Sequence, residues 1–212
     1  MIGISKLYCG AVEPGDVLRY HRDSRELPSH LLQFSADKRP VVVWNMTRRC
    51  NLKCRHCYAN SRDIDYPDEL TTGEAKAMID DLAAFGSPVL LFSGGEPLMR
   101  PDLPELLQYT VDQGMRAVIS TNGTRITAAK AATFQKIGLS YVGISLDGIA
   151  STHDRFRGVA GAYAATMQGL RNCREAGLKV GVRFTINRHN VADVPAIFDL
   201  LEAEQIPRCC FY

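Results

Sequence analysis

The sequence predicts an α/β protein with a parallel sheet, and its alternating pattern supports this fold class. Short β-branched or apolar runs alternate with longer segments whose apolar spacing fits helices, which is the order of repeated βα units. Expected strands cover residues 41–46, 88–92, 116–120, 141–145, 180–186 and 208–212, and expected helices cover 72–84, 103–113, 127–137, 161–176 and 192–204. The alternation alone fits either a doubly wound sheet or a barrel.

The expected helices carry their own start and stop signals. Thr71-Thr72-Gly73-Glu74 has the pattern of a capping box, and Pro101-Asp102-Leu103-Pro104 is a typical opening for the next helix. Thr127 is a candidate cap for the helix after that. A glycine follows four of the helices, where a left-handed backbone favours it: Gly86, Gly114, Gly138 and Gly177. These signals bound the helices and support the βα assignment.

The composition is that of a globular domain in a reducing compartment. The 212 residues suffice for one sizeable core, and the formal net charge of +2 gives no sign of a general nucleic-acid binder. No apolar run approaches the roughly 20 residues that span a bilayer, and the N-terminus lacks a signal-peptide core. We therefore expect a cytoplasmic protein without membrane contact. The seven cysteines are odd in number and clustered, which favours a metal site over a disulfide scaffold.

Two regions are expected along the chain. Residues 1–38 form a polar N-terminal lead-in that contains Cys9, expected to be a free thiol, and residues 39–212 form the core domain. The sixth expected strand is not followed by a helix that would cover it. We therefore expect a chain that is truncated after this strand.

Three cysteines, Cys50, Cys54 and Cys57, lie close together directly after the first expected strand. Three thiolates are one fewer than a closed four-coordinate metal site requires. A cubane [4Fe–4S] cluster held by three cysteines keeps one iron free for another ligand, and this spacing lets one loop reach three corners of the cube. Zinc with His56 as fourth ligand is the rival. It is disfavoured because adjacent side chains cannot easily point at one tetrahedral centre.

The cysteine loop, residues 50–58, has the pattern C-x3-C-x2-C with a ring residue before the last cysteine. It resembles the cluster-binding loop of the radical S-adenosylmethionine (SAM) family. Later strands end in motifs that are similar to family motifs in the same order: Ser93-Gly94-Gly95-Glu96-Pro97, Ser120-Thr121-Asn122-Gly123-Thr124, Ser145-Leu146-Asp147-Gly148 and His153-Asp154-Arg155-Phe156-Arg157-Gly158. The resemblance implies a partial (βα)6 barrel of the TIM type, a [4Fe–4S] cluster on the three cysteines, and bound SAM.

The resemblance also implies which residues bind SAM. Paired glycines let the backbone approach a ligand, and the Glu96 carboxylate can accept from the methionine amino group. Ser145 and Asp147 alternate along a strand and would share a face, while Arg155 or Arg157 would hold a carboxylate, either of SAM or of the substrate. The expected cofactor-binding residues are Gly94, Gly95, Glu96, Pro97, Asn122, Ser145, Asp147, Arg157 and Arg183. No catalytic side chain is assigned.

The opening residues 1–20 and the block 27–38 are similar to the tetrapyrrole-modifying branch of the family, which serves haem and haem d1 biosynthesis. This resemblance implies removal of acetate side chains from didecarboxysiroheme through a 5′-deoxyadenosyl radical, giving iron-coproporphyrin. It also implies an electron donor such as flavodoxin or ferredoxin, and a second [4Fe–4S] cluster in a C-terminal extension that is absent here. Five arginines would suit a polycarboxylate substrate: Arg48, Arg49, Arg155, Arg157 and Arg183.

Three alternatives stay open at this point. The first is a radical SAM enzyme that modifies a peptide or protein, since the motif at residues 145–148 is shared with that branch. The second is an RNA-modifying relative, which the absence of a basic, aromatic-rich pattern disfavours. The third is a non-catalytic iron–sulfur scaffold or zinc-binding module, which would leave the glycine pair at 94–95 unexplained.

Overall fold

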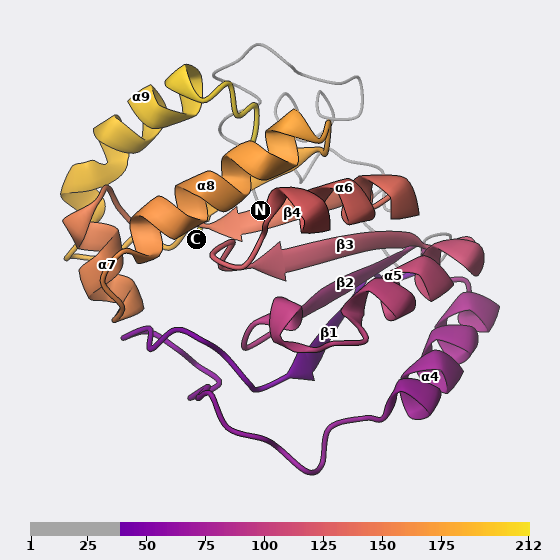
Figure 1. Cartoon of the computed structure of the whole chain (residues 1–212). Helices are drawn as coiled ribbons and strands as arrows, with labels where there is room; N and C mark the ends of the chain where they lie inside the picture. Colours follow the sequence, from indigo (N-terminus) through magenta and orange to yellow (C-terminus); the bar gives the residue numbers. More distant parts are fainter. Residues whose placement is uncertain (1–38) are drawn as a thin grey trace, which may run out of the picture.

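The computed structural model describes residues 39–212, in which strands and helices alternate as the sequence predicts (Figure 1). The strands are β1 (Val42–Thr47), β2 (Val89–Gly94), β3 (Arg116–Thr121), β4 (Tyr141–Ser145), β5 (Val180–Phe184) and β6 (Cys209–Phe211). The helices are α4 (Thr72–Phe85), α5 (Leu103–Asp112), α6 (Ala128–Ile137), α7 (Ser151–Arg157), α8 (Ala162–Glu175) and α9 (Val194–Ala203), with the 3-10 turns η2 (Pro97–Met99) and η3 (Val191–Asp193). The lead-in and Cys9 lie outside the described residues.

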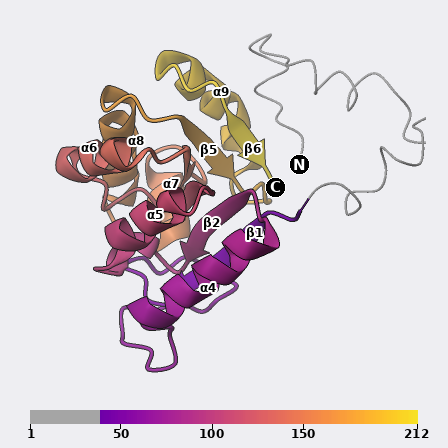
Figure 2. The same cartoon turned by 90° about the vertical axis from the view of Figure 1, so that its right-hand side faces the viewer.

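The six strands form one parallel sheet in the order β1-β2-β3-β4-β5-β6. In a doubly wound sheet the strand order reverses at a switch point, whereas here every strand pairs with its successor in the chain. Figure 2 shows the helices arranged around the outside of this sheet. The architecture is therefore the partial (βα)6 barrel that the resemblance implied, with β1 and β6 as the sheet edges within the described residues.

The core lies between the sheet and its outer helices. Leu90, Phe92 and Ile119 on the strands are fully buried, as are Ile79 on α4 and Leu106 on α5. Burying such apolar side chains is the main force that holds the helices on the sheet. No helix among residues 39–212 has the length and apolar character that crossing a bilayer would need.

The helix signals in the sequence act as expected. Thr71 Oγ1 accepts from the backbone N–H of Glu74 (3.3 Å), and the Glu74 carboxylate accepts from the N–H of Thr71 (2.8 Å), which completes the capping box. Thr127 caps α6 in a similar way by accepting from Lys130 N–H at 3.2 Å. All four glycines that follow helices have positive φ. These contacts fix where each helix begins and ends.

Helix α7 was not predicted, because its sequence lacks an apolar repeat. Phe156 is its one buried apolar residue, and its other buried side chains are His153 and Arg157. A helix that buries polar groups on its inner face gives no hydrophobic periodicity to detect. No helix was expected over these residues, which were identified only as a motif after the fourth strand, and α7 is an addition to the expected elements.

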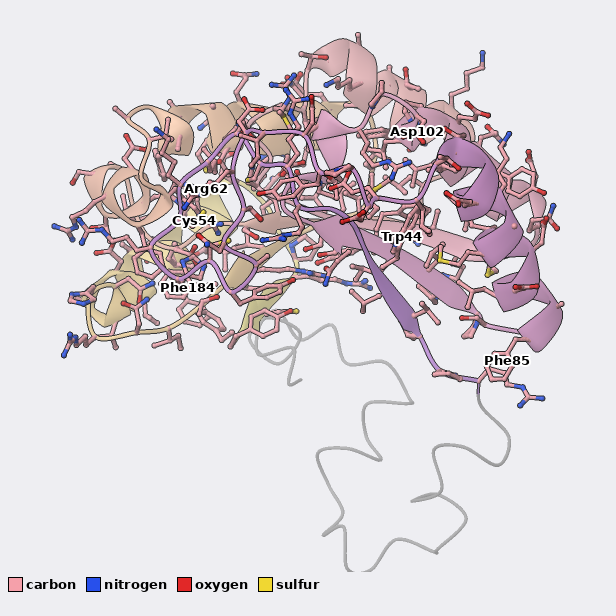
Figure 3. All side chains as sticks on the ribbon, turned by 90° about the horizontal axis from the view of Figure 1, so that it is seen from below. Trp44, Cys54, Arg62, Phe85, Asp102 and Phe184 are labelled. Atoms are coloured by element: carbon pink, nitrogen blue, oxygen red, sulfur yellow. The ribbon has the colours of Figure 1, made fainter. Side chains whose placement is uncertain are left out.

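The mouth of the barrel is the end where the strands have their carboxyl termini. Cys54 and Arg62 lie in the loop at this end, whereas Phe85, the last residue of α4, lies at the opposite end (Figure 3). In parallel α/β folds, loops at the carboxyl ends of strands form the functional sites. The cysteine loop and the later motifs therefore meet at one end of the barrel.

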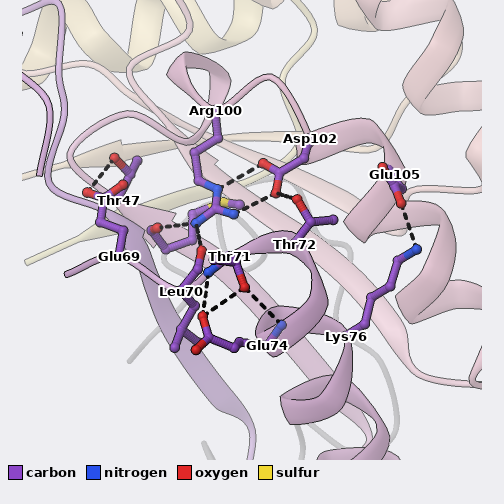
Figure 4. A network of polar contacts seen from close by, with 11 residues as sticks. Thr47, Glu69, Leu70, Thr71, Thr72, Glu74, Lys76, Arg100, Asp102 and Glu105 are labelled. Atoms are coloured by element: carbon purple, nitrogen blue, oxygen red, sulfur yellow. Dashed lines mark hydrogen bonds and ion pairs between the residues drawn. The ribbon is translucent and has the colours of Figure 1, made fainter. Parts of the chain in front are cut away.

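Arg100, in the segment between β2 and α5, fixes the segment that joins β1 to α4 (Figure 4). Its Nη1 donates to the carbonyl oxygens of Met46 (3.1 Å) and Leu70 (3.0 Å), and its guanidinium pairs with Asp102 at 2.6 Å. Asp102 also accepts from Thr72 Oγ1 at 2.8 Å. Burial works to raise the pKa of Asp102, but the bonds from Arg100 and Thr72 outweigh it and lower this pKa.

Candidate active site

A cavity of about 300 Å3 opens at the mouth of the barrel, and residues from the ends of β1 to β6 line it. Nine of the twelve predicted site residues lie on its wall: Cys50, Cys54, Cys57, Gly94, Gly95, Asn122, Ser145, Arg157 and Arg183. The other three, Glu96, Pro97 and Asp147, are buried behind the wall. Residues that are far apart in the sequence thus meet in one cavity.

The cysteine loop is held at both of its ends. Before it, Glu69 Oε1 accepts from Thr47 Oγ1 (2.9 Å) and from the N–H of Arg48 (2.7 Å). Arg49 pairs with Asp63 at 2.6 Å, and Cys50 N–H donates to the Arg62 carbonyl at 3.1 Å. These bonds fix the direction in which the chain leaves β1.

Further along the cysteine loop, the end of α7 supplies the backbone partners. Lys53 N–H donates to the carbonyl of Arg157 and Arg55 N–H to that of Phe156, each at 3.0 Å. Gly158 follows with a φ of +70°, and a Cβ there would overlap the Lys53 carbonyl oxygen. Only glycine allows this approach without strain, so the Arg-Gly pair at the end of the predicted motif joins α7 to the cysteine loop.

Each thiol of the loop has an N–H donor close to its sulfur. Leu52 N–H lies 3.5 Å from Cys50 Sγ, Ser61 N–H lies 3.4 Å from Cys57 Sγ, and Arg157 Nη1 lies 3.5 Å from Cys54 Sγ. Such donors stabilise the negative charge of thiolate ligands and help to set a cluster's reduction potential.

The spread of the thiols bears on the kind of metal group that they fit. Among residues 39–212, no three His, Cys, Asp or Glu side chains converge on a position for a single metal ion. In a cubane each thiolate binds a different iron, so the three thiols need not converge on one point. Three thiols with N–H donors that line one cavity therefore fit a [4Fe–4S] cluster.

The thiols differ in acidity. Burial raises the pKa of Cys50 to about 11. Burial also works to raise the pKa of Cys57, but N–H bonds from Ser61, Ala59 and Asn60 outweigh it and lower this pKa. Ligand cysteines bind iron as thiolates, so loading a cluster releases their protons.

The glycine pair after β2 lies against the backbone of the segment that follows β1. Gly95 N–H donates to the Thr47 carbonyl (2.7 Å) and Glu96 N–H to the Arg49 carbonyl (2.9 Å). A Cβ on Gly94 would overlap the Thr47 carbonyl, and one on Gly95 would lie 2.5 Å from the Arg49 oxygen. The glycines were predicted to let the backbone approach a ligand. They line the cavity, and they also let two loops of the protein approach each other.

The Glu96 carboxylate is fully buried, and protein donors occupy it. Oε1 accepts from Thr121 Oγ1 (2.7 Å) and Leu98 N–H (3.1 Å), while Oε2 accepts from Asn122 N–H (2.8 Å). Burial raises its pKa against the effect of these three bonds. Glu96 thereby ties the turn after β2 to the end of β3, and a contact of its carboxylate with SAM stays a prediction.

Asp147 and Arg157 form a buried ion pair behind the cavity wall. Asp147 Oδ2 lies 2.5 Å from Arg157 Nη2 and 3.7 Å from His56 Nε2, and Oδ1 accepts from Thr185 N–H at 3.0 Å. His153 Nδ1 accepts from Asp147 N–H at 3.0 Å, and burial lowers the pKa of His153 to about 3, so this ring is neutral. Asp147 thus orients the guanidinium that contacts Cys54.

Arg183 crosses the inner face of the barrel from β5 to β3. Its Nη1 donates to Ser120 Oγ at 2.5 Å, and its path runs over Gly143 on β4, where a Cβ would lie 2.6 Å from Arg183 Nε. Arg183 has no carboxylate partner among the described residues. A guanidinium of this kind on a cavity wall suits the carboxylate of a bound molecule.

Several cavity residues were missed by sequence reasoning. Tyr58 directly follows the last cysteine, and Tyr212 follows β6. Asn51 accepts from Asn122 Nδ2 (3.0 Å) and donates to Thr124 Oγ1 (2.9 Å), which joins the cysteine loop to the loop after β3. The position of each one directly after a strand or beside a cysteine was the available signal.

A partial barrel with three thiols and a glycine pair at its mouth defines a class of iron–sulfur enzymes that use SAM. The family model of the Radical SAM superfamily matches residues 44–201, and the chain belongs to this superfamily. The cofactors of the superfamily are a [4Fe–4S] cluster and SAM.

Two curated relatives place the chain more closely. It is 69% identical to the Fe-coproporphyrin III synthase of Methanosarcina barkeri over 212 residues, which cover 100% of this chain and 53% of that protein. It is 46% identical to the pre-heme d1 synthase of Dinoroseobacter shibae over 80% of this chain and 42% of that protein. The chain therefore spans about half the length of the curated relatives that it matches.

Solved structures agree on the fold. Native anSMEcpe with bound AdoMet has a TM-score of 0.70 at 17% identity, covering 81% of this chain and 50% of that chain. Streptococcus suis SuiB bound to the precursor peptide SuiA has a TM-score of 0.71 at 16% identity, covering 98% of this chain and 52% of that chain. At these identities the likeness shows a shared barrel.

Proposed function

We propose that this chain forms the cluster- and SAM-binding barrel of a radical SAM enzyme that modifies a tetrapyrrole in haem biosynthesis. The proposed reaction removes acetate side chains from didecarboxysiroheme and gives iron-coproporphyrin. The observation that carries the proposal is 69% identity, over every residue of this chain, to a protein named Fe-coproporphyrin III synthase. The cavity supports it, because the three cysteines and Arg183 line the same cavity.

The residues of the chain have separate tasks in this proposal. Cys50, Cys54 and Cys57 would hold the cluster, and Arg157 would donate to the Cys54 sulfur, as it does at 3.5 Å in the structure. When bound, the reduced cluster and SAM supply a 5′-deoxyadenosyl radical that abstracts hydrogen from the substrate. Arg183 would hold a carboxylate, and the surrounding wall would exclude water from the reacting atoms.

The electron that starts each turnover must come from outside the chain, and a flavodoxin or a ferredoxin is the proposed donor. The domain boundary at residue 39 is also part of the proposal. A second [4Fe–4S] cluster in a C-terminal extension stays a prediction, and it concerns the half of the relatives that this chain does not span.

Modification of a peptide is the second candidate function. It is favoured by a 31% identical relative, the PqqA peptide cyclase of Granulibacter bethesdensis, which matches 76% of this chain. The higher identity to proteins named for tetrapyrrole products favours the first candidate. The two candidates differ in what stimulates SAM cleavage.

The test is anaerobic reconstitution with iron and sulfide, reduction with dithionite in the presence of SAM, and chromatography for 5′-deoxyadenosine. Assays run with and without didecarboxysiroheme, and mass spectrometry follows iron-coproporphyrin. We expect deoxyadenosine to rise with the porphyrinoid and the product to lack acetate groups. If the protein carries its cluster but didecarboxysiroheme does not change the rate of SAM cleavage, the result would count against a tetrapyrrole substrate and favour the peptide candidate.

A cysteine pair controls for cluster loading. Cys54→Ala should lose the cluster, because two thiolates do not hold the cubane. Cys173→Ala removes a thiol that is buried in α8, away from the cavity, and should keep about four irons per chain. Retention of the cluster and of SAM cleavage in Cys54→Ala would contradict the assignment of the ligands.

A further inference from the structure

A second cavity of about 300 Å3 lies beside the first and is lined by basic side chains. Arg55 comes from the cysteine loop, Arg155 from α7, and Arg188 and His189 from the segment after β5. Thr152, Asn187 and Phe156 complete the wall together with His56, which also lines the first cavity. Among the described residues, this lining contains no aspartate or glutamate.

The three arginines of this cavity differ from most arginines around the mouth. Arg49 is paired with Asp63 and Asp65, Arg157 is paired with Asp147, and Arg48 stacks on the Tyr66 ring at 4.7 Å. Within residues 39–212, no carboxylate lies at ion-pair distance from the guanidinium groups of Arg55, Arg155 and Arg188. These three arginines are exposed, and each is without an ion-pair partner in this part of the chain.

The chemistry of the lining selects an anionic ligand with planar oxygen pairs. A guanidinium presents its N–H groups in a fork that matches a carboxylate, and several cations around one cavity attract polyanions. Arg188 Nε donates to Nε2 of the neighbouring His189 at 3.2 Å. Thr152 and Asn187 add neutral donors, and Phe156 offers an apolar surface for the carbon chain that carries a carboxylate.

We propose that this cavity, the arginine pocket of Arg55, Arg155 and Arg188, binds peripheral carboxylates of the substrate. The inference rests on the proposed function, because a tetrapyrrole with propionate side chains is a polycarboxylate. The first cavity must already hold the cluster and SAM, so the periphery of the substrate needs further space. The arginine pocket shares His56 with that cavity, and a volume of about 300 Å3 suits side chains rather than a whole macrocycle.

The test measures binding of iron-coproporphyrin III, the product of the proposed reaction, to the reconstituted chain by its absorbance change. The variant is Arg155→Gln/Arg188→Gln, and the matched control is Arg116→Gln, an exposed arginine at the start of β3 and thus at the other end of the barrel. Relative to wild type, we expect the Kd to rise at least about tenfold in the double variant and to change less than about twofold in the control. The reason is that the loss of one charge-assisted hydrogen bond weakens binding by about a factor of ten. Circular dichroism checks that both variants fold.

The outcomes separate this inference from the proposed function. Equal Kd values in wild type and double variant would overturn the arginine pocket while leaving the tetrapyrrole function standing. If the double variant then accepts electrons from flavodoxin more slowly than the wild type, the arginines form a docking surface for an acidic redox protein. If the wild-type chain does not bind iron-coproporphyrin III, the proposal for the arginine pocket is wrong. If didecarboxysiroheme does not change SAM cleavage, the proposed function is wrong.

Discussion

Replacing Glu96 with alanine should cost the fold a large part of its stability. The carboxylate accepts from Thr121 Oγ1, Leu98 N–H and Asn122 N–H at 2.7, 3.1 and 2.8 Å, and it has no exposed surface. A buried donor without a partner costs about 1–3 kcal/mol. Three such donors, partly relieved by water that enters the space left behind, give a loss of about 3–5 kcal/mol in the free energy of unfolding.

The assay is urea unfolding of the metal-free chain followed by circular dichroism, so that cluster loading does not enter the result. Glu105→Ala is the matched control. Its carboxylate pairs with Lys76 at 2.6 Å on the surface, and an exposed pair of this kind contributes less than about 1 kcal/mol. A loss of under about 1 kcal/mol in Glu96→Ala would refute the reasoning.

Three further predictions concern the residues around the cysteine loop. Arg157→Gln removes the donor to Cys54 Sγ, so the cluster potential should become more negative by up to about 60 mV in a redox titration, and an unchanged potential would contradict that contact. The lowered pKa of His153, about 3, means that the unfolded chain binds a proton that the folded chain does not. The free energy of unfolding should therefore fall by about 1.4 kcal/mol for each unit by which the pH is lowered from about 6.5 to about 3. Urea unfolding of His153→Gln should lack this pH dependence. In thermal unfolding, Gly158→Ala should lower the free energy of unfolding by at least about 2 kcal/mol, and this variant should retain less iron. Gly161→Ala has open space at its Cβ, so it should lose only the smaller cost of placing alanine at a positive φ.

The fold was predictable because its signals are local. Strand and helix runs, the Thr71 capping box and the glycines after the helices are each written within a few residues. The choice between a doubly wound sheet and a barrel was not local. This choice depends on which strands pair, and the periodicity of the sequence fits both folds. The resemblance to the radical SAM family decided it.

The position of most candidate residues at one cavity was predictable, because they follow the carboxyl ends of parallel strands, but their contacts were less so. Asp147 was expected to share a face with Ser145, but β4 ends at Ser145, so the alternation of a strand no longer applies two residues later. Glu96 was expected to meet a ligand, and its partners Thr121 and Asn122 are 25 and 26 residues away in the sequence. No local pattern shows that a carboxylate is buried among such distant donors.

The contacts of the cysteine loop also set an order of events during synthesis. The three thiols are complete once Cys57 is made, but two of the side chains that reach their sulfurs come much later. Asn122 lies 72 residues after Cys50, and Arg157 lies 103 residues after Cys54. Contacts at such separation form only after most of the barrel has left the ribosome. The loop therefore lacks these two side-chain contacts until α7 has folded, and we expect stable insertion of iron and sulfide to be a late step in the maturation of the chain.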